Sequence, residues 1–185
     1  MLNESVLRFR RLIAGNIRVD WKKRAPSVLL FVLGFILIGL LINTAAARYR
    51  IGVGFSQSLP FDFYLIKLGE MPRKNDYVAF IMDKPNPYYK PGIQFGKRVS
   101  GISGDVLTVK GRDYYINGMF VASAMTTDTK KRPVGQFLPT LDEHGNTVIP
   151  EGRFFVLTDH PMSYDSRYWG YLEKEKILGK MIPIF

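Results

Sequence analysis

Two serines, Ser56 and Ser58, stand two residues apart in the stretch FSQSLPF, just before Pro60. A serine hydroxyl presented in an exposed turn can act as a nucleophile if a neighbouring group removes its proton. The same pattern is also typical of a plain turn, because serine bonds back to the backbone and proline restricts φ. The stretch leaves both interpretations open, and the choice depends on whether the chain supplies a base.

Histidine and lysine are the two candidate bases. His160 directly follows Asp159, and neighbouring residues on a strand point to opposite faces, so Asp159 is poorly placed to orient the imidazole. We therefore expect a surface histidine rather than a Ser-His-Asp triad. Lys97 stands beside Arg98 in a strand-like stretch, so one of the two can face the core while the other faces solvent. Only a buried lysine acts as a base near neutrality, and two solvated side chains are the alternative.

The elements that must position these residues are predicted to be strands. Residues 50–185 show short runs of β-branched and aromatic residues between turn residues, with no long amphipathic helical pattern. Gly111-Arg112-Asp113 closes one predicted hairpin, and Asn117-Gly118 predicts a type I′ turn into the run MFVAS. This spacing favours one mainly β domain with a mostly antiparallel sheet. The predicted strands are residues 77–82, 106–110, 114–118, 153–157 and 176–184.

Two stretches are predicted to be loops. Residues 83–92 contain three prolines, and residues 126–146 are polar without clear periodicity. A stretch as long as 126–146 is expected to be either a flap or a disordered excursion.

The charge pattern near the N-terminus predicts a membrane segment. The net charge is +10, and within residues 1–24 seven basic residues stand against two acidic ones. Residues 25–47 follow without a charge, and these 23 residues are long enough to cross a bilayer as a helix. The positive-inside rule predicts a basic cytoplasmic segment at 1–24, an anchor at 25–47 and export of residues 48–185. Ala45-Ala46-Ala47 also resembles a signal-sequence cleavage site, so a cleaved segment is the alternative.

The residue inventory narrows the chemistry. The chain has no cysteine, which excludes disulfides, thiol nucleophiles and thiolate metal sites. With only His144 and His160, and no H-E-x-x-H pattern, a zinc enzyme is not expected. The basic excess lies just before the apolar segment, so it indicates membrane topology rather than a nucleic-acid partner.

Four stretches, in order, resemble the sequence boxes of the membrane-bound Ser/Lys signal peptidases (S26-like). The fixed frame DSRYWG near the end is the most specific match. The stretches are SQSLP, RKNDYVAF at 73–80, GKRVSGISGDVLTVKGRDYYING at 96–118 and IPEGRFFVLTDHPMSYDSRYWG at 149–170.

The resemblance implies roles for individual residues. Ser58 matches the nucleophile and Lys97 the general base that removes its proton. Ser56 matches the hydroxyl that joins the Ser58 backbone N–H in an oxyanion hole, a pair of donors aimed at developing negative charge.

Three further residues match supporting positions of the family. Ser163 matches the serine that helps to orient the lysine. Asp165 and Arg167 match a pair that is expected to form a salt bridge and to shape the site without reacting. The implied fold is a signal-peptidase-like (LexA-like) antiparallel β-sheet catalytic domain preceded by one N-terminal transmembrane helix.

Details of the boxes look more like the TraF-type peptidases of conjugative transfer systems, which mature pilin precursors. Leu59 follows Ser58 where general signal peptidases usually have methionine, and TDHPMSYDSRYWG replaces their usual Gly-Asp-Asn-Arg-Asp stretch. Asp62 departs from the TraF type, which often has glycine there.

The resemblance therefore implies a single-pass serine endopeptidase of the bacterial inner membrane, with its N-terminus in the cytoplasm and its catalytic domain in the periplasm. Its partners would be the bilayer and a pilin or signal-peptide-bearing precursor, with no cofactor, metal or nucleic acid. Two alternatives are a self-cleaving repressor-type Ser/Lys protease and an inactive membrane-tethered scaffold of a conjugation or secretion assembly.

Overall fold

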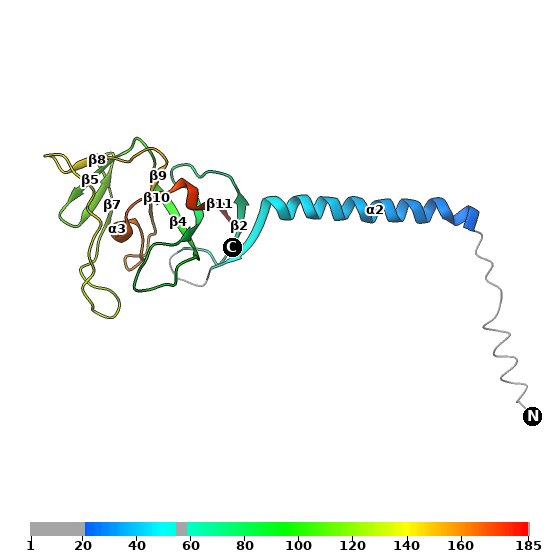
Figure 1. The fold of residues 1–185 in the computed structure, drawn as a ribbon, viewed down its shortest axis with the longest axis horizontal. Coiled ribbons are helices and arrows are strands. Elements are labelled where there is room, and N and C mark those ends of the chain that lie inside the picture. Colours follow the sequence, from blue (N-terminus) through cyan, green and yellow to red (C-terminus); the bar gives the residue numbers. More distant parts are fainter. Residues whose placement is uncertain (1–20, 55–58, 185) are drawn as a thin grey trace, which may run out of the picture. The chain divides into compact units, whose positions relative to one another are not determined.

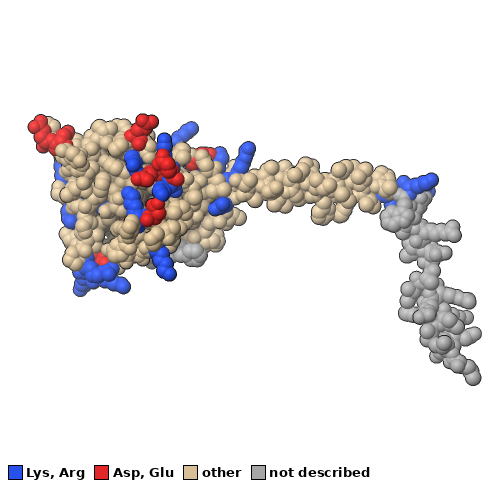
Figure 2. All heavy atoms as spheres, in the orientation of Figure 1, with Lys and Arg blue, Asp and Glu red and all other residues tan. Residues whose placement is uncertain are grey.

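A computed structural model describes residues 21–54 and 59–184, and the chain divides into two units after Ala45. Most of the helix α2 (Trp21–Arg48) belongs to the first unit. Between Lys22 and Arg48, a stretch of 18 residues has a mean hydropathy of 2.7, and none of this stretch is buried. Figure 2 shows the middle of this helix free of charged side chains, with basic side chains at its ends. An apolar helix of this length is consistent with a single-pass membrane anchor.

The second unit is built from two antiparallel sheets, which confirms the expected mainly β fold (Figure 1). One sheet has seven strands in the order β1-β2-β11-β3-β4-β9-β10, and the other has four in the order β7-β6-β5-β8. The elements are β1 (Tyr49–Val53), β2 (Phe63–Leu68), β3 (Tyr77–Met82), β4 (Ile93–Gly101), β5 (Val106–Lys110), β6 (Asp113–Ile116), β7 (Met119–Ser123), β8 (Asn146–Val148), β9 (Arg153–Leu157), α3 (Ser166–Trp169), β10 (Leu172–Glu173), η1 (Lys174–Lys176) and β11 (Ile177–Pro183).

The two sheets share a hydrophobic core. Leu107 and Tyr114 of the smaller sheet cluster with Phe155 and Leu157 of the larger one, and all four are buried. The rings of Tyr114 and Phe155 stack with centroids 5.5 Å apart. Since burying one large apolar side chain is worth about 1.5–3 kcal/mol, this cluster holds the sheets together.

The larger sheet exposes an apolar face on β1 and β2. The register pairs Ile51 with Leu65 and Val53 with Phe63, so these four side chains point the same way. Ile51 is 76% exposed and Phe63 is 49% exposed. A run of exposed apolar side chains on one face of a sheet indicates a surface that contacts a membrane or another protein.

Residues 126–146 are ordered by contacts within the stretch and by a hydrogen bond to the rest of the domain. Thr127 forms an isolated bridge with Pro133, and the Val134 N–H donates to the Thr126 carbonyl at 2.9 Å. The Tyr114 hydroxyl donates to the Phe137 carbonyl at 2.6 Å. These contacts favour the flap interpretation of this stretch over the disordered one.

Candidate active site

Lys97 lies on β4 and faces the interior of the domain. The register places it opposite Val78 of β3, whose side chain is fully buried. Lys97 is 4% exposed, whereas the side chain of the next residue, Arg98, is 39% exposed. The strand alternation therefore buries the lysine and leaves its neighbour in solvent, and the alternative with both solvated is wrong.

Among the described residues, the ammonium group of Lys97 has one polar partner and an aromatic neighbour. Its Nζ donates a hydrogen bond of 2.8 Å to Ser163 Oγ, and Ser163 is itself buried. Nζ also lies 5.4 Å from the ring centroid of Phe95, two residues earlier on the strand. Burial lowers the pKa of Lys97 to about 8, and the negative charge of Asp165 only partly offsets this effect. A lysine in this state can give up its proton near physiological pH.

Asp165 and Arg167 form a buried pair at the start of α3. The Asp165 carboxylate caps the helix by accepting the Arg167 backbone N–H, and it accepts Arg167 Nε at 2.8 Å and Nη2 at 2.7 Å. Burial raises the pKa of the Asp165 carboxyl, and the hydrogen bonds from Arg167 oppose that rise. Arg167 also donates to the carbonyls of Ser123 and Ser163, at 2.8 and 3.1 Å. The guanidinium therefore fixes the loop that carries the partner of Lys97.

Two residues of this support were missed at the sequence level. Ser166 is fully buried, and its Oγ accepts the Val156 N–H of β9 at 2.9 Å. The Tyr114 hydroxyl, which donates to the Phe137 carbonyl, shares its proton with the Arg167 carbonyl at 3.1 Å. The position of Ser166 between Asp165 and Arg167 could have indicated its supporting role. Nothing local in the sequence connects Tyr114 to this loop.

Ser56 and Ser58 lie outside the described residues. The described residue that follows them, Leu59, packs against β4 at Gly96, on the strand face opposite to the Lys97 side chain. A Cβ added to Gly96 would lie 2.8 Å from Leu59 Cδ1 and 2.9 Å from Met181 Cε. Glycine at position 96 therefore allows the chain after Ser58 to approach β4 one residue from Lys97.

Asp159 and His160 do not form a catalytic pair. Asp159 accepts a hydrogen bond of 2.9 Å from Arg98, and His160 Nδ1 accepts the Met162 backbone N–H at 3.2 Å. His160 is partly exposed, as expected for a histidine at the surface rather than in a Ser-His-Asp triad. Within residues 21–54 and 59–184, no group of three His, Cys, Asp or Glu side chains is arranged to hold a metal ion.

Comparison with known proteins extends over nearly the whole chain. The family model described as signal peptidase, peptidase S26, matches residues 24–185. Signal peptidase I of Bacillus caldolyticus is 34% identical over 116 residues, which are 59% of each chain. A probable signal peptidase I-2 of Synechocystis sp. is 32% identical over 92 residues, 49% of this chain and 38% of the relative. The chain thus matches less than two thirds of the length of these relatives.

Among solved structures, a signal peptidase I from Enterococcus faecalis V583 is 27% identical and aligns with a TM-score of 0.40. The aligned region covers 61% of this chain and 98% of that one. The family match includes β4 with Lys97, the loop with Ser163 and the DSR turn, and it begins just before the uncharged part of α2. The chain therefore belongs to the peptidase S26 family of signal peptidases.

Proposed function

We propose that this protein is a serine endopeptidase that removes signal peptides from membrane-associated precursors, with Ser58 as nucleophile and Lys97 as general base. The observation that carries the proposal is the buried Lys97 amine, held by Ser163 and lowered in pKa to about 8. A structural role does not require a lysine in this position, because an apolar side chain would fill the same space without the cost of burying a charge.

The proposed reaction has two steps. The Ser58 hydroxyl oxygen attacks the scissile carbonyl carbon, and its proton passes to the neutral amine of Lys97. The new N-terminal amine of the product leaves with that proton as the C–N bond breaks, and water then hydrolyses the acyl-enzyme. Ser56 and the Ser58 backbone N–H would donate to the oxyanion, and one such donor is worth about 3–4 kcal/mol.

The membrane is the proposed place of action. The apolar helix α2 supplies the anchor, and the basic residues before it favour a cytoplasmic N-terminus and a periplasmic catalytic domain at a bacterial inner membrane. The exposed apolar face around Ile51 and Phe63 supports work beside a bilayer. On the face of the β domain in Figure 2, lysines and arginines lie among aspartates and glutamates rather than forming one basic patch, which does not favour a nucleic-acid partner.

A narrower proposal concerns the substrate. Leu59 after the nucleophile and the stretch TDHPMSYDSRYWG favour a TraF-type role in the maturation of pilin precursors for conjugation. The product would then be either a linear chain or one cyclised by a substrate amine that attacks the acyl-enzyme.

We expect full-length protein to shorten a co-expressed precursor at one bond, as intact mass measures directly. Two precursors separate the proposals: a general signal-peptide-bearing protein and a pilin precursor from a conjugative system. Cleavage of the pilin alone supports the narrower role, and a product lighter than the linear one by one water shows cyclisation. The Ser58→Ala protein should leave both precursors intact while still reaching the membrane. Cleavage by that variant contradicts the assigned nucleophile, and intact precursors with the wild type favour the scaffold alternative.

The rate of cleavage is expected to rise with pH through about 8. Burial lowers the pKa of Lys97 to about 8, and only the uncharged amine can accept the Ser58 proton. Because lysine loses its charge as the pH rises, kcat/KM should fall about tenfold for each pH unit below the pKa and level off above it. The measurement is kcat/KM against pH with an uncharged peptide substrate. A profile that decreases with rising pH over this range rules out Lys97 as the base.

A further inference from the structure

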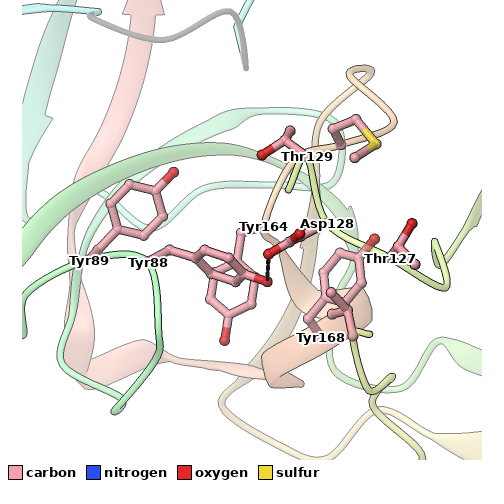
Figure 3. Close-up of a pocket in the computed structure, with 9 residues that line it drawn as sticks. Tyr88, Tyr89, Thr127, Asp128, Thr129, Tyr164 and Tyr168 are labelled. Carbon is pink, nitrogen blue, oxygen red and sulfur yellow. Dashed lines mark hydrogen bonds between the residues drawn. The ribbon is translucent and has the colours of Figure 1, made fainter. Parts of the chain in front are cut away.

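A pocket lined by tyrosines lies beside the contact between Lys97 and Ser163. Its cavity volume is about 150 Å³, and its walls come from the β3–β4 loop, the 126–134 stretch and the segment around α3 (Figure 3). We call it the tyrosine pocket. It is lined mainly by Tyr88, Tyr89, Tyr164 and Tyr168, with Thr129 and Met162 at its edge.

Two separate connections join the tyrosine pocket to the proposed base. Met162 and Tyr164, which both line the pocket, flank Ser163, whose Oγ accepts the hydrogen bond from Lys97. On the other side, the ring of Tyr89 packs edge-on against Phe95 at 4.9 Å, and Phe95 faces the Lys97 ammonium at 5.4 Å. A substrate peptide whose cleavable bond lies at Lys97 can therefore place a neighbouring side chain in this pocket.

The size and walls of the pocket suit one aromatic ring. An engineered apolar cavity of about 150 Å³ holds a benzene molecule, which is the size of a phenylalanine ring. Tyr88 and Tyr164 meet edge to face at 4.9 Å, and Tyr164 stacks on Tyr168 at 5.8 Å. Figure 3 shows the rings of Tyr88, Tyr164 and Tyr168 next to one another among the residues that line the pocket. Aromatic walls of this kind favour a further ring in edge or offset contact.

The charge of the pocket argues against a cationic ligand. Its one carboxylate belongs to Asp128, whose Oδ2 accepts Arg132 Nε at 2.8 Å and lies 2.7 Å from Arg132 Nη2. The other oxygen, Oδ1, accepts the backbone N–H groups of Lys130 and Arg132. The Arg132 guanidinium also lies 5.7 Å from the ring centroid of Tyr88. A positive ligand would therefore meet a carboxylate that is already neutralised and an aromatic face that is already taken.

We propose that the tyrosine pocket is a specificity site that binds one aromatic side chain of the substrate, near the bond that is cleaved. This rests on the proposed peptidase function and adds to it a preference for one class of side chain in the substrate.

The experiment uses the full-length protein in lipid–detergent micelles and a peptide substrate with alanines around a cleavable bond. A set of peptides carries a single phenylalanine at each position on both sides of the bond, and a parallel set carries lysine. We expect phenylalanine to raise kcat/KM by at least about tenfold over alanine at one position, and lysine to give no such gain.

Thr129→Trp is the variant that tests the site, because Thr129 is exposed at the pocket edge and an indole there would fill it. The ratio of kcat/KM for the phenylalanine and alanine peptides should then fall to about one in this variant. The ratio is taken within one protein, so a general loss of activity cancels. Lys130→Trp changes the next exposed residue, which does not line the pocket, and should keep the wild-type ratio.

The outcomes separate the two proposals. If the wild type cleaves no peptide, the peptidase function itself fails. If it cleaves the alanine peptide but gains nothing from phenylalanine at any position, the pocket proposal is wrong. The proposal is also overturned if lysine is preferred, or if the phenylalanine gain persists in Thr129→Trp.

Discussion

Lys97→Met protein is expected to cleave its substrate at least about a thousandfold more slowly than the wild type while remaining folded. Methionine has nearly the length of lysine and fills the same buried space on β4 without the amine. In the proposed mechanism, the Ser58 hydroxyl then lacks the base that takes its proton. Ser163 also loses the hydrogen bond of 2.8 Å that it accepts from Lys97 Nζ. The measurement is kcat/KM for a peptide substrate at pH 8.5 or about that value, where wild-type Lys97 is largely uncharged.

The stability of the same variant distinguishes a functional lysine from a structural one. Lowering the pKa of Lys97 from 10.5 to about 8 means that the wild type bears a cost on the order of 3 kcal/mol at pH 7 for its buried ammonium. The unfolded chain binds the proton more tightly, so wild-type stability should rise with pH between about 8 and 10.5, and this rise should be absent in Lys97→Met. Pulse proteolysis in urea measures the free energy of unfolding of both proteins across this pH range. Lys176→Met, which removes an exposed lysine paired with Asp83, is the control and should change neither activity nor this pH dependence. A strongly destabilised Lys97→Met protein contradicts the catalytic interpretation.

Arg167→Met is expected to destabilise the β domain by about 3–5 kcal/mol. The substitution leaves the Asp165 carboxylate fully buried without its cation, and the carbonyls of Ser123 and Ser163 lose a donor. The urea midpoint for loss of protease resistance measures the change.

Two further variants give this prediction its controls. Arg98→Met breaks an ion pair with Asp159 in which the side chains are 39% and 71% exposed, and it should cost less than about 1 kcal/mol. Adding Asp165→Asn to Arg167→Met removes the stranded charge and should recover part of the loss. Equal effects of Arg98→Met and Arg167→Met would show that the buried pair contributes no more than an exposed one.

Local sequence was sufficient to predict several strands of the fold. The bounds of β3, β5 and β9 match the predicted residues 77–82, 106–110 and 153–157, because β-branched and aromatic runs lie between clear turn residues. By contrast, β1 and β2 were not predicted as strands, nor was β8, which begins at Asn146, the last residue of the stretch expected to be a loop. Strands β1 and β2 depend on pairing, since β2 finds one of its two partners in β11, far along the chain.

In the candidate site, too, local sequence predicted some features, whereas others depend on contacts between distant segments. Alternation on a strand predicted that either Lys97 or Arg98 could enter the core, and the family resemblance favoured Lys97. The structure shows Lys97 buried, with 4% exposure. The bond from Tyr114 to the Arg167 carbonyl joins residues 53 positions apart, which no periodic pattern encodes. The tyrosine pocket is likewise assembled from three separate segments, which no local pattern in the sequence connects.

The position of β11 sets a time order on biosynthesis. This strand, the last to be synthesised of those described, lies between β2 and β3 in the larger sheet, and neither neighbour pairs with the other. At synthesis rates of about 5–20 residues per second, β2 emerges several seconds before the strand that must cover its edge. The larger sheet therefore cannot complete its pairing until Ile177–Pro183 has been synthesised, and β2 and β3 each keep one unpaired edge until then.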